Sequence, residues 1–322
     1  MSGDLILAAP SKGRLQEQAA AYFADCGLAI AQGAGDRGYA ARMPALPAID
    51  VRLVSAGDIA KMLRDGEVHL GVTGEDVLRE ADPGLEAALL VKPLGFGHAD
   101  LVVAAPQSWI DVTTMADFAD VCADFRARTG RRLRVATKYL RQARDFMAAH
   151  GVEDYRLVES AGATEGAPAA GAAEAIVDIT TTGRTLAANH LKPLQDGLIL
   201  KSQAHLAASR RAHWTEAGFA ALERLLDVVE ARGRAKAMRL LRLAPGPGGP
   251  EAILERAAAL GCRVASADAG AMLELYCPTA SVFSVCAALQ ELLGGTIGVF
   301  EADFIFERPN ARFDQVRAGL RA

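Results

Sequence analysis

The chain has 322 residues, of which 51% are hydrophobic and 6% aromatic. At ~100 to 200 residues per domain, this length predicts two or three domains. The 35 basic and 39 acidic side chains leave a formal net charge of −4, which excludes the global positive field that attracts nucleic acid or an anionic membrane. Any anion must therefore be bound by a local group of residues.

The cysteines and the first residues point to the cytoplasm. The five cysteines are scattered, without a C-x-x-C pair or metal-ligand spacing, as is typical of reduced thiols. The opening "MSGDLILAAPSKGRL" has no basic segment before its apolar run, and that run is shorter than the ~7 to 15 residues of a signal core. No stretch approaches the ~20 apolar residues of a membrane span. We expect a soluble cytoplasmic protein.

Strand and helix patterns alternate along the first 80 residues. The apolar runs "LILAAP", "IDVRLVSA" and "VHLGVTG" precede helical patterns at Gly13 to Gly27, in "GDIAKMLRDG" and in "EDVLREA". The first helix carries one apolar stripe, formed by Leu15, Ala19, Tyr22, Phe23 and Cys26. This alternation predicts a largely parallel sheet covered on both faces.

Two long extended passages bracket a second series of strands and helices. The first is "AALLVKPLGFGHADLVVAAP", interrupted at Gly95 to Gly97, and the second is "LKPLQDGLILKSQAHLAAS". Between them lie the strands of "RRLRVATKY", "YRLVESA" and "AIVDITTTG". The pattern predicts one α/β lobe, residues 100–194, inserted into another, residues 1–99 with 195–233, and a ligand-binding cleft between them.

The last 90 residues contain a different module. A helix with Leu222, Leu225, Leu226 and Val229 on one face leads to the strand "MRLLRLAP" and the break "PGPGGP". Helix, two strands, helix and strand follow, which completes a βαββαβ order. Residues 234–322 are therefore predicted to form a split-βαβ domain.

The segment "IVDITTTGRTLAANH", residues 176–190, is the main candidate for a ligand site. Threonines 180, 181, 182 and 185 surround Gly183 at the end of a strand, and a helix begins near Arg184. The pattern predicts a phosphate site, because the hydroxyls can donate hydrogen bonds, the glycine lets the backbone come close to the ligand, and the helix N-terminus attracts negative charge. Asp178 and Glu174 upstream suit the hydroxyls of a sugar, so the pattern predicts a ribose 5-phosphate group as the ligand. A single Thr-Gly would more often be an ordinary helix cap.

Two familiar phosphate motifs are excluded. The sequence has no G-x-x-x-x-G-K-[ST] motif. "GAGDRG", Gly33 to Gly38, fits G-x-G-x-x-G, but Pro44 and Pro47 prevent the helix that must follow a dinucleotide-binding loop. We interpret it as a mobile hairpin loop.

Two further loops follow strands of the first lobe. "APSKGRL" places Lys12 and Arg14 at the start of a helix, where cations oppose the helix dipole, which favours anion binding over simple solvation. "GVTGEDVLRE" ends a strand at Gly74 and opens a helix with Glu75 and Asp76. Acids at that position are also ordinary caps, so this loop is ambiguous alone.

A fourth loop belongs to the second lobe. "VATKYLRQARD" presents Thr137, Lys138 and Tyr139 at a strand end. Because all four loops follow strand C-termini, two in each lobe, they can face one cleft. Hydrolytic and metal-centred motifs are absent from the sequence: it has no G-x-S-x-G, no H-E-x-x-H, and six histidines without ligand spacing.

From about Leu5 to Leu206 the chain resembles the ATP phosphoribosyltransferase family. The phrases "APSKGRL", "GDIAKMLRDGEVHLGVTGEDVLRE", "LGFGHADLVVAA", "RVATKY", "GATEGAPAAGAAEAIVDITTTGRTLAANHL" and "LILKSQAHL" occur in the family's order. The most specific stretch runs from Gly162 to Leu191. The resemblance implies two periplasmic-binding-protein-like α/β lobes around a cleft, as in type IV phosphoribosyltransferases, and a C-terminal ferredoxin-like domain. It also implies that N1 of ATP attacks C1 of phosphoribosyl pyrophosphate (PRPP), with inversion and release of pyrophosphate.

The resemblance assigns the site residues to two substrates. Those expected to bind PRPP are Glu165, Glu174, Asp178, Thr180, Thr181, Thr182, Gly183, Arg184 and Thr185. Those expected to bind ATP or pyrophosphate are Ser11, Lys12, Arg14, Gly71, Gly74, Asp76, Thr137, Lys138 and Tyr139. Mg²⁺ is expected mainly on the substrate phosphates. No residue is assigned a catalytic role, because the acceptor of the adenine amino proton is not readable from the sequence.

The length and the βαββαβ order favour the long form of the family, whose C-terminal regulatory domain binds histidine as an inhibitor. A homo-oligomer, with dimers assembling to hexamers, is also implied. The chain departs from the family pattern at His69, at Ala163 and Thr164, and in residues 121–131.

Three other kinds of protein share some of these features. A solute-binding protein is disfavoured by the absence of a signal segment and by two separate polyanion candidates. An inactive regulatory paralogue should have lost the threonine loop. A base-salvage phosphoribosyltransferase has two adjacent acids before that loop, whereas here Val177 precedes Asp178.

Overall fold

The N-terminal apolar runs form the middle of a seven-stranded sheet with the order β2-β3-β4-β1-β5-β12-β6. Its strands are β1 (Leu5–Pro10), β2 (Ala31–Gln32), β3 (Ala40–Arg42), β4 (Ile49–Val54), β5 (Leu70–Gly74), β6 (Ala88–Pro93) and β12 (Ala204–Ser209). β1 pairs in parallel with β4 and β5. The helices α1 (Gly13–Asp25), α2 (Ala56–Asp65) and α3 (Glu75–Ala81) therefore all begin at one edge of this sheet.

This computed structural model describes residues 4–32, 40–160, 162–246, 249–267, 272–293 and 295–321. The motif at residues 33–38, interpreted above as a hairpin loop, lies outside these ranges. The chain divides into two units, residues 1–221 with 316–322 and residues 222–315. The expected three-domain division, with a boundary at residue 233, stays a prediction.

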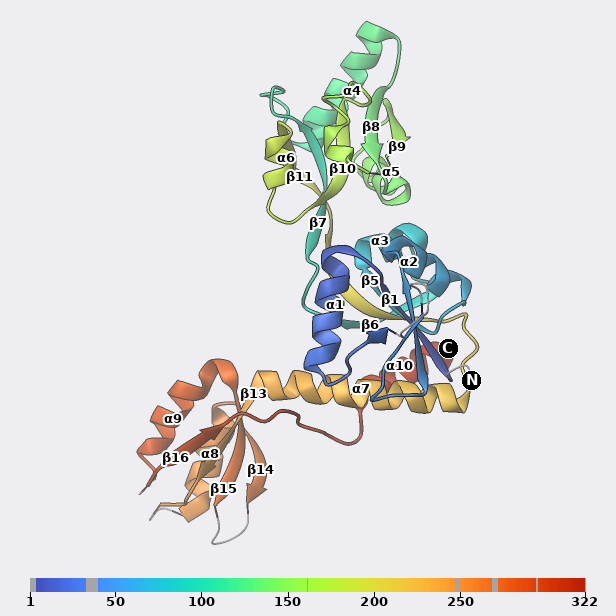
Figure 1. The fold of residues 1–322 in the computed structure, drawn as a ribbon. Helices are drawn as coiled ribbons and strands as arrows, with labels where there is room; N and C mark the ends of the chain where they lie inside the picture. The colour runs from blue at the N-terminus through green and yellow to red at the C-terminus, as the bar shows by residue number, and fades with distance from the viewer. Residues whose placement is uncertain are drawn as a thin grey trace. The chain divides into compact units, whose positions relative to one another are not determined.

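A second sheet of the first unit has the order β11-β7-β10-β8-β9. Its strands are β7 (Ala99–Pro106), β8 (Leu133–Thr137), β9 (Tyr155–Glu159), β10 (Ala175–Thr180) and β11 (Leu191–Ser202). α4 (Met115–Thr129), α5 (Leu140–Ala149) and the short α6 (Arg184–Ala188) accompany it (Figure 1). β8 runs parallel to β10 and β9, so the residues that follow β8 and β10 lie at the same edge.

Apolar side chains cover both faces of this second sheet. Val103, Val135 and Val177 pack with Phe118 and Met147 of the helices in one cluster, while Val102, Ala136 and Ile176 pack with Leu186 of α6 in another. Burial on both faces is the reason why these strands read as continuous apolar runs.

Two antiparallel chain segments connect the two sheets. The N–H of Leu94 donates to the carbonyl of Ala204 at 2.9 Å, and the N–H of Ala204 donates to the carbonyl of Phe96 at 2.9 Å. One segment leads from β6 to β7, and the other returns from β11 to β12. The α/β lobe built on β7 to β11 is therefore inserted into the first lobe, which confirms the expected fold class.

The second unit contains the expected βαββαβ order. Its elements are β13 (Met238–Leu243), α8 (Gly249–Ala259), β14 (Arg263–Ala267), β15 (Leu273–Pro278), α9 (Val282–Gln290) and β16 (Ile297–Phe300). The strands pair antiparallel in the order β14-β15-β13-β16, and a core that includes Leu241, Ile253 and Val285 joins the sheet to α8 and α9. This is the ferredoxin-like arrangement.

Two helices contain residues of both units. They are α7 (Glu216–Ala237) and α10 (Ala311–Arg321). Within the described ranges, no helix is both long and apolar enough to cross a bilayer. All five cysteines are free thiols.

Candidate functional site

A cavity of about 320 Å³ lies at the C-terminal end of β10, and we call it the β10 pocket. Lys138 and Asp178 reach it from the ends of the neighbouring parallel strands β8 and β10. Glu165 comes from a 3₁₀ turn, Thr164–Gly166, and Thr185 from α6. Gly162, Ala163, Thr164, Ile179 and Leu186 complete the lining. The pocket thus combines two carboxylates, a cation and a threonine hydroxyl.

The environment of Asp178 disfavours its charged form. Burial raises the pKa of its carboxyl group, and the nearby charges of Glu165 and Asp76 raise it further. The hydrogen bond from the N–H of Ile179, at 2.8 Å, and the positive charge of Lys138 lower the pKa, but by less than burial and the two acids raise it. The pKa of Asp178 therefore lies above its ordinary value, and the group gains from a ligand that donates hydrogen bonds or brings positive charge.

The threonine loop is divided between two cavities. The hydroxyl of Thr180 accepts from the N–H of Gly183 at 2.9 Å and closes the turn. Thr181 donates to the carbonyl of His98 at 3.1 Å and lines a second cavity. Thr185 lines the β10 pocket. The loop therefore does not direct all its hydroxyls at one phosphate, because Thr180 bonds Gly183, whose φ is 72°, and Thr181 bonds the carbonyl of His98.

The second cavity, about 500 Å³, lies beside α1, and we call it the α1 cavity. Arg14 and Lys138 supply its cations, and Gly74 and Asp76 supply part of its wall. Ser11 and Lys12 do not line it: the N–H of Ser11 donates to the carbonyl of Val54 at 2.9 Å, and Lys12 is the exposed N-cap residue of α1. Lys138 lines both cavities, so the two cavities adjoin at this side chain.

Sequence reasoning missed part of the α1 cavity. Gln18 contributes from α1, and Phe96 and His98 contribute from the connection to β7. The glycines at positions 95 and 97 were a usable signal, because they interrupt a long extended run where a strand had no reason to stop.

Asp76 links the two lobes. Its carboxylate accepts a hydrogen bond from the Tyr139 hydroxyl at 2.5 Å and another from Ser202 Oγ at 2.7 Å. The N–H of Asp76 donates to Ser202 Oγ at 3.0 Å, and the side chain of Gln142 donates to its carbonyl at 2.8 Å. Burial and the charge of Asp76 raise the pKa of Tyr139 far above its ordinary value, so Tyr139 remains a protonated donor. The polar groups of Asp76 and Tyr139 serve the contact between the lobes.

Gly71 and Thr137, both expected at the ligand, are buried in the lobes instead. A Cβ atom at Gly71 would lie 2.6 Å from Ile59 Cγ2 and 2.9 Å from Leu63 Cδ1, so the glycine allows α2 to pack closely against β5. Thr137 is fully buried, and its hydroxyl accepts from the N–H of Tyr139 at 2.9 Å. Gly71 lies in β5 and Thr137 ends β8, so each residue supports the loop that follows its strand.

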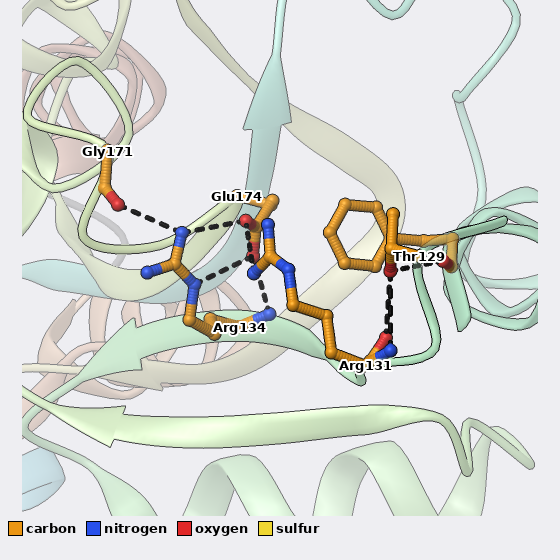
Figure 2. A network of polar contacts seen from close by, with 6 residues as sticks. Thr129, Arg131, Arg134, Gly171 and Glu174 are labelled. Carbon is orange, nitrogen blue, oxygen red and sulfur yellow. Dashed lines mark hydrogen bonds and ion pairs between the residues drawn. The ribbon is translucent and has the colours of Figure 1, made fainter.

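Glu174 lies beside Arg134 and Arg131, which point toward its carboxylate (Figure 2). It immediately precedes β10 and lies four residues before Asp178 of this strand, so ~3.3 Å per residue places the two about 13 Å apart. Its carboxylate accepts from the backbone N–H of Arg134 at 2.7 Å and from Arg134 Nη2 at 2.8 Å, and Arg131 lies at 3.4 Å. The expectation that Glu174 binds the same ribose as Asp178 is therefore corrected: its partner is Arg134.

The pKa of Glu174 supports this structural role. Burial alone would raise it, but the hydrogen bonds from the side chain and the backbone of Arg134 outweigh burial and hold the pKa below its ordinary value. Arg134 is fixed in turn, because its Nη2 also donates to the carbonyl of Gly171 at 2.9 Å. The described residues contain no group of three or more His, Cys, Asp or Glu side chains that could hold a metal ion.

Comparison with known proteins gives consistent matches. The model of the family "HisG: ATP phosphoribosyltransferase" matches residues 55–231. The ATP phosphoribosyltransferase of Caulobacter vibrioides is 52% identical over 324 residues, which cover 100% of this chain and 99% of that relative. The enzyme of the same name from a Bradyrhizobium species is 48% identical over 326 residues, which cover 100% of each chain. Among solved structures, the ATP phosphoribosyl transferase (HisG:HisZ) complex from Thermotoga maritima matches with a TM-score of 0.53 and 26% identity, covering 70% of this chain and 98% of that chain.

Proposed function

The chain belongs to the ATP phosphoribosyltransferase family, and we propose that the β10 pocket and the α1 cavity together form its substrate site. The protein is a pentosyltransferase that transfers the phosphoribosyl group of PRPP to N1 of ATP and releases pyrophosphate, the first step of histidine biosynthesis. The observation that supports this site is the placement of Asp178, Glu165 and Thr185 around one cavity at the end of the threonine loop.

PRPP occupies the β10 pocket in this proposal. The carboxylates of Asp178 and Glu165 accept hydrogen bonds from the ribose hydroxyls, since a hydroxyl donor relieves the unfavourable surroundings of Asp178. Thr185 and the backbone of the threonine loop bind the 5-phosphate. Because Thr180 already bonds the N–H of Gly183, it supports the loop.

ATP occupies the α1 cavity. Arg14 and Lys138 bind its phosphates or the departing pyrophosphate. Adenine N1 is a weak nucleophile, so the main contribution of the protein is to hold N1 in line with the C1–O bond of PRPP. Lys138 lines both cavities. Its positive charge is therefore placed to stabilise pyrophosphate as it leaves PRPP next to the bound ATP.

The carboxylates of the β10 pocket also fit a magnesium ion. Mg²⁺ is usually bound by one or two carboxylates together with substrate phosphates, and Glu165 and Asp178 supply two such groups. Bound mainly through the substrate phosphates, such an ion would neutralise the negative charge on the departing pyrophosphate.

We further propose a three-domain organisation, inhibition by histidine and a homo-oligomeric assembly. The lobes are residues 1–99 with 195–233 and residues 100–194, and residues 234–322 form a regulatory domain to which histidine binds as an inhibitor. The ferredoxin-like order of the second unit supports this assignment. The enzyme assembles as a homo-oligomer of dimers, up to a hexamer, and works in the cytoplasm, where free thiols such as its five are stable.

The test is an assay of pyrophosphate release from ATP, PRPP and Mg²⁺, with and without histidine. We expect release that needs both substrates and decreases when histidine is added. If no pyrophosphate is released, the proposed substrate site is wrong. Release that histidine leaves unchanged would refute only the regulatory role of residues 234–322.

A further inference from the structure

One face of α1 borders the α1 cavity. Arg14, Leu15 and Gln18 line it, and their spacing of one and then three residues places them on the same side of a helix. Arg14 supplies charge and Leu15 supplies apolar surface. Gln18 differs from both, because its amide offers a hydrogen-bond donor and an acceptor side by side.

The carbonyl oxygen of Gln18 is buried and has no hydrogen-bond partner within the part of the chain that the structure describes. A buried polar atom without a partner destabilises the folded protein, so native proteins seldom keep one without a reason. The terminal torsion of glutamine is broad and roughly two-fold, so rotation about it can turn the amide toward a ligand in the cavity. A ligand in the cavity can therefore supply the missing partner.

The surroundings of Gln18 suit a flat apolar ring. Phe96 lies in the wall, with its ring centroid 5.8 Å from that of Tyr22 on α1. Gly97 has φ of 65°, and a Cβ atom there would lie 3.2 Å from Leu15 Cδ1, so its lack of a side chain keeps the connection close to α1. Leu15 and Phe96 thus supply apolar surface next to one unpaired amide carbonyl.

A purine matches this combination. Adenine is flat, and glutamine recognises it by paired hydrogen bonds to the amino group N6 and the ring nitrogen N7. The reaction takes place at N1, so a side chain that binds adenine must use an edge that leaves N1 free. The N6/N7 edge meets this condition.

We propose that Gln18 determines the specificity for the adenine base: its side-chain carbonyl accepts from N6, and its side-chain amino group donates to N7. This inference rests on the proposed placement of ATP in the α1 cavity. It adds a contact that neither the family resemblance nor the comparisons assign.

The experiment measures binding of ATP and of 7-deaza-ATP, which lacks the N7 acceptor, to the wild type and to a Gln18→Leu variant. We expect the wild type to bind ATP roughly tenfold more tightly than 7-deaza-ATP, the order expected from about one hydrogen bond. The Gln18→Leu variant, which loses both hydrogen bonds, should bind the two nucleotides with the same affinity, roughly tenfold to a hundredfold weaker than wild-type binding of ATP. Its KM for PRPP should not change, and its unfolding temperature should not fall, because the substitution removes an unpaired polar group.

Gln16→Leu is the matched control, since Gln16 lies on the same helix and lines a separate hollow of about 50 Å³. It should bind ATP as the wild type does. If Gln18→Leu also binds ATP like the wild type and keeps its preference over 7-deaza-ATP, the inference is wrong while the substrate site stands. A wild type that neither binds ATP nor releases pyrophosphate would overturn both proposals.

Discussion

Asp178 and Glu174 show that two acids close in sequence can have opposite roles. They lie toward opposite ends of β10, and their surroundings shift their pKa values in opposite directions. Asp178 borders a cavity. Its charged form is destabilised there, so a ligand that donates hydrogen bonds to the carboxylate is bound favourably. Glu174 is held by Arg134. Its charged form is stabilised by this contact, which in turn stabilises the folded protein.

An Asp178→Asn variant should be more stable than the wild type at pH 7 and should bind PRPP more weakly. Because the pKa of Asp178 is raised in the folded state, the folded protein holds more protons than the unfolded chain, and stability is lost as the pH rises from the unfolded to the folded pKa. Asparagine removes that loss. Urea unfolding at pH 4 and pH 7 measures the stability, and the KM for PRPP should rise about tenfold or more. An unchanged KM would remove Asp178 from the proposed site.

A Glu174→Gln variant should behave in the opposite way. It loses an ion pair with Arg134, in which the carboxylate is mostly buried, so we expect a loss of about 1–3 kcal/mol in the free energy of unfolding. The lowered pKa of Glu174 gives stability that is present above the unfolded pKa and is lost as the pH falls through the folded pKa. The variant should lack this acid-dependent loss. The KM for PRPP should be unchanged, and a large increase would contradict the structural role.

At the scale of elements, α3, α5 and β11 meet at Asp76. The buried carboxylate accepts from Tyr139, which precedes α5, and from Ser202 at the end of β11. A Tyr139→Phe variant leaves one carboxylate oxygen of Asp76 without its donor, so we expect a loss of about 1–3 kcal/mol in unfolding free energy. Because Asp76 and Lys138 border the α1 cavity, the KM for ATP should also rise.

Tyr155→Phe is the control for this prediction. Tyr155 lies on β9 at the edge of the second sheet, away from Asp76, and its loss of a hydroxyl should change the unfolding free energy by less than about 0.5 kcal/mol. Equal effects of the two substitutions, measured by urea unfolding, would show that Tyr139 does not hold the lobes together.

At the scale of the whole molecule, the C-terminal residues return to the first unit. Arg317 and Arg321 pair with Glu216 at 2.9 and 2.5 Å, and their guanidinium groups lie 5.3 and 5.2 Å from the ring centroid of Phe219. Gly319 accepts a hydrogen bond from Arg210. Residues after the ferredoxin-like module therefore contribute to the stability of the unit that carries the substrate site.

A chain truncated after residue 315 should lose about 1–3 kcal/mol of stability in the first unit, since exposed ion pairs provide ~0.2–1 kcal/mol each and exposed cation–π contacts ~0.5–1 kcal/mol each. Tryptophan fluorescence is a selective readout, because both tryptophans, Trp109 and Trp214, belong to that unit. An Arg128→Ala variant, which removes an exposed pair with Asp124 at 3.4 Å, serves as control. A truncated protein that unfolds like the full chain would show that the returning segment is dispensable.

The order of the elements was predictable from the sequence because it depends on local patterns. Apolar runs of β1 and β5, the stripe of α1 and the break before α8 are each contained in a few neighbouring residues. The same holds for the threonine loop, whose hydroxyls and glycine lie within six positions of one another. The two-lobe fold, the βαββαβ module and the family could therefore be inferred without coordinates.

The pairing of polar groups was decided only by the tertiary structure. Glu174 meets Arg134 across 40 positions, Asp76 meets Tyr139 across 63, and Asp76 meets Ser202 across 126. An acid at the start of β10 and an acid near its end look alike in the sequence, yet an arginine neutralises one and a cavity surrounds the other. Whether a carboxylate binds the protein or a substrate depends on neighbours that only folding brings within hydrogen-bond distance.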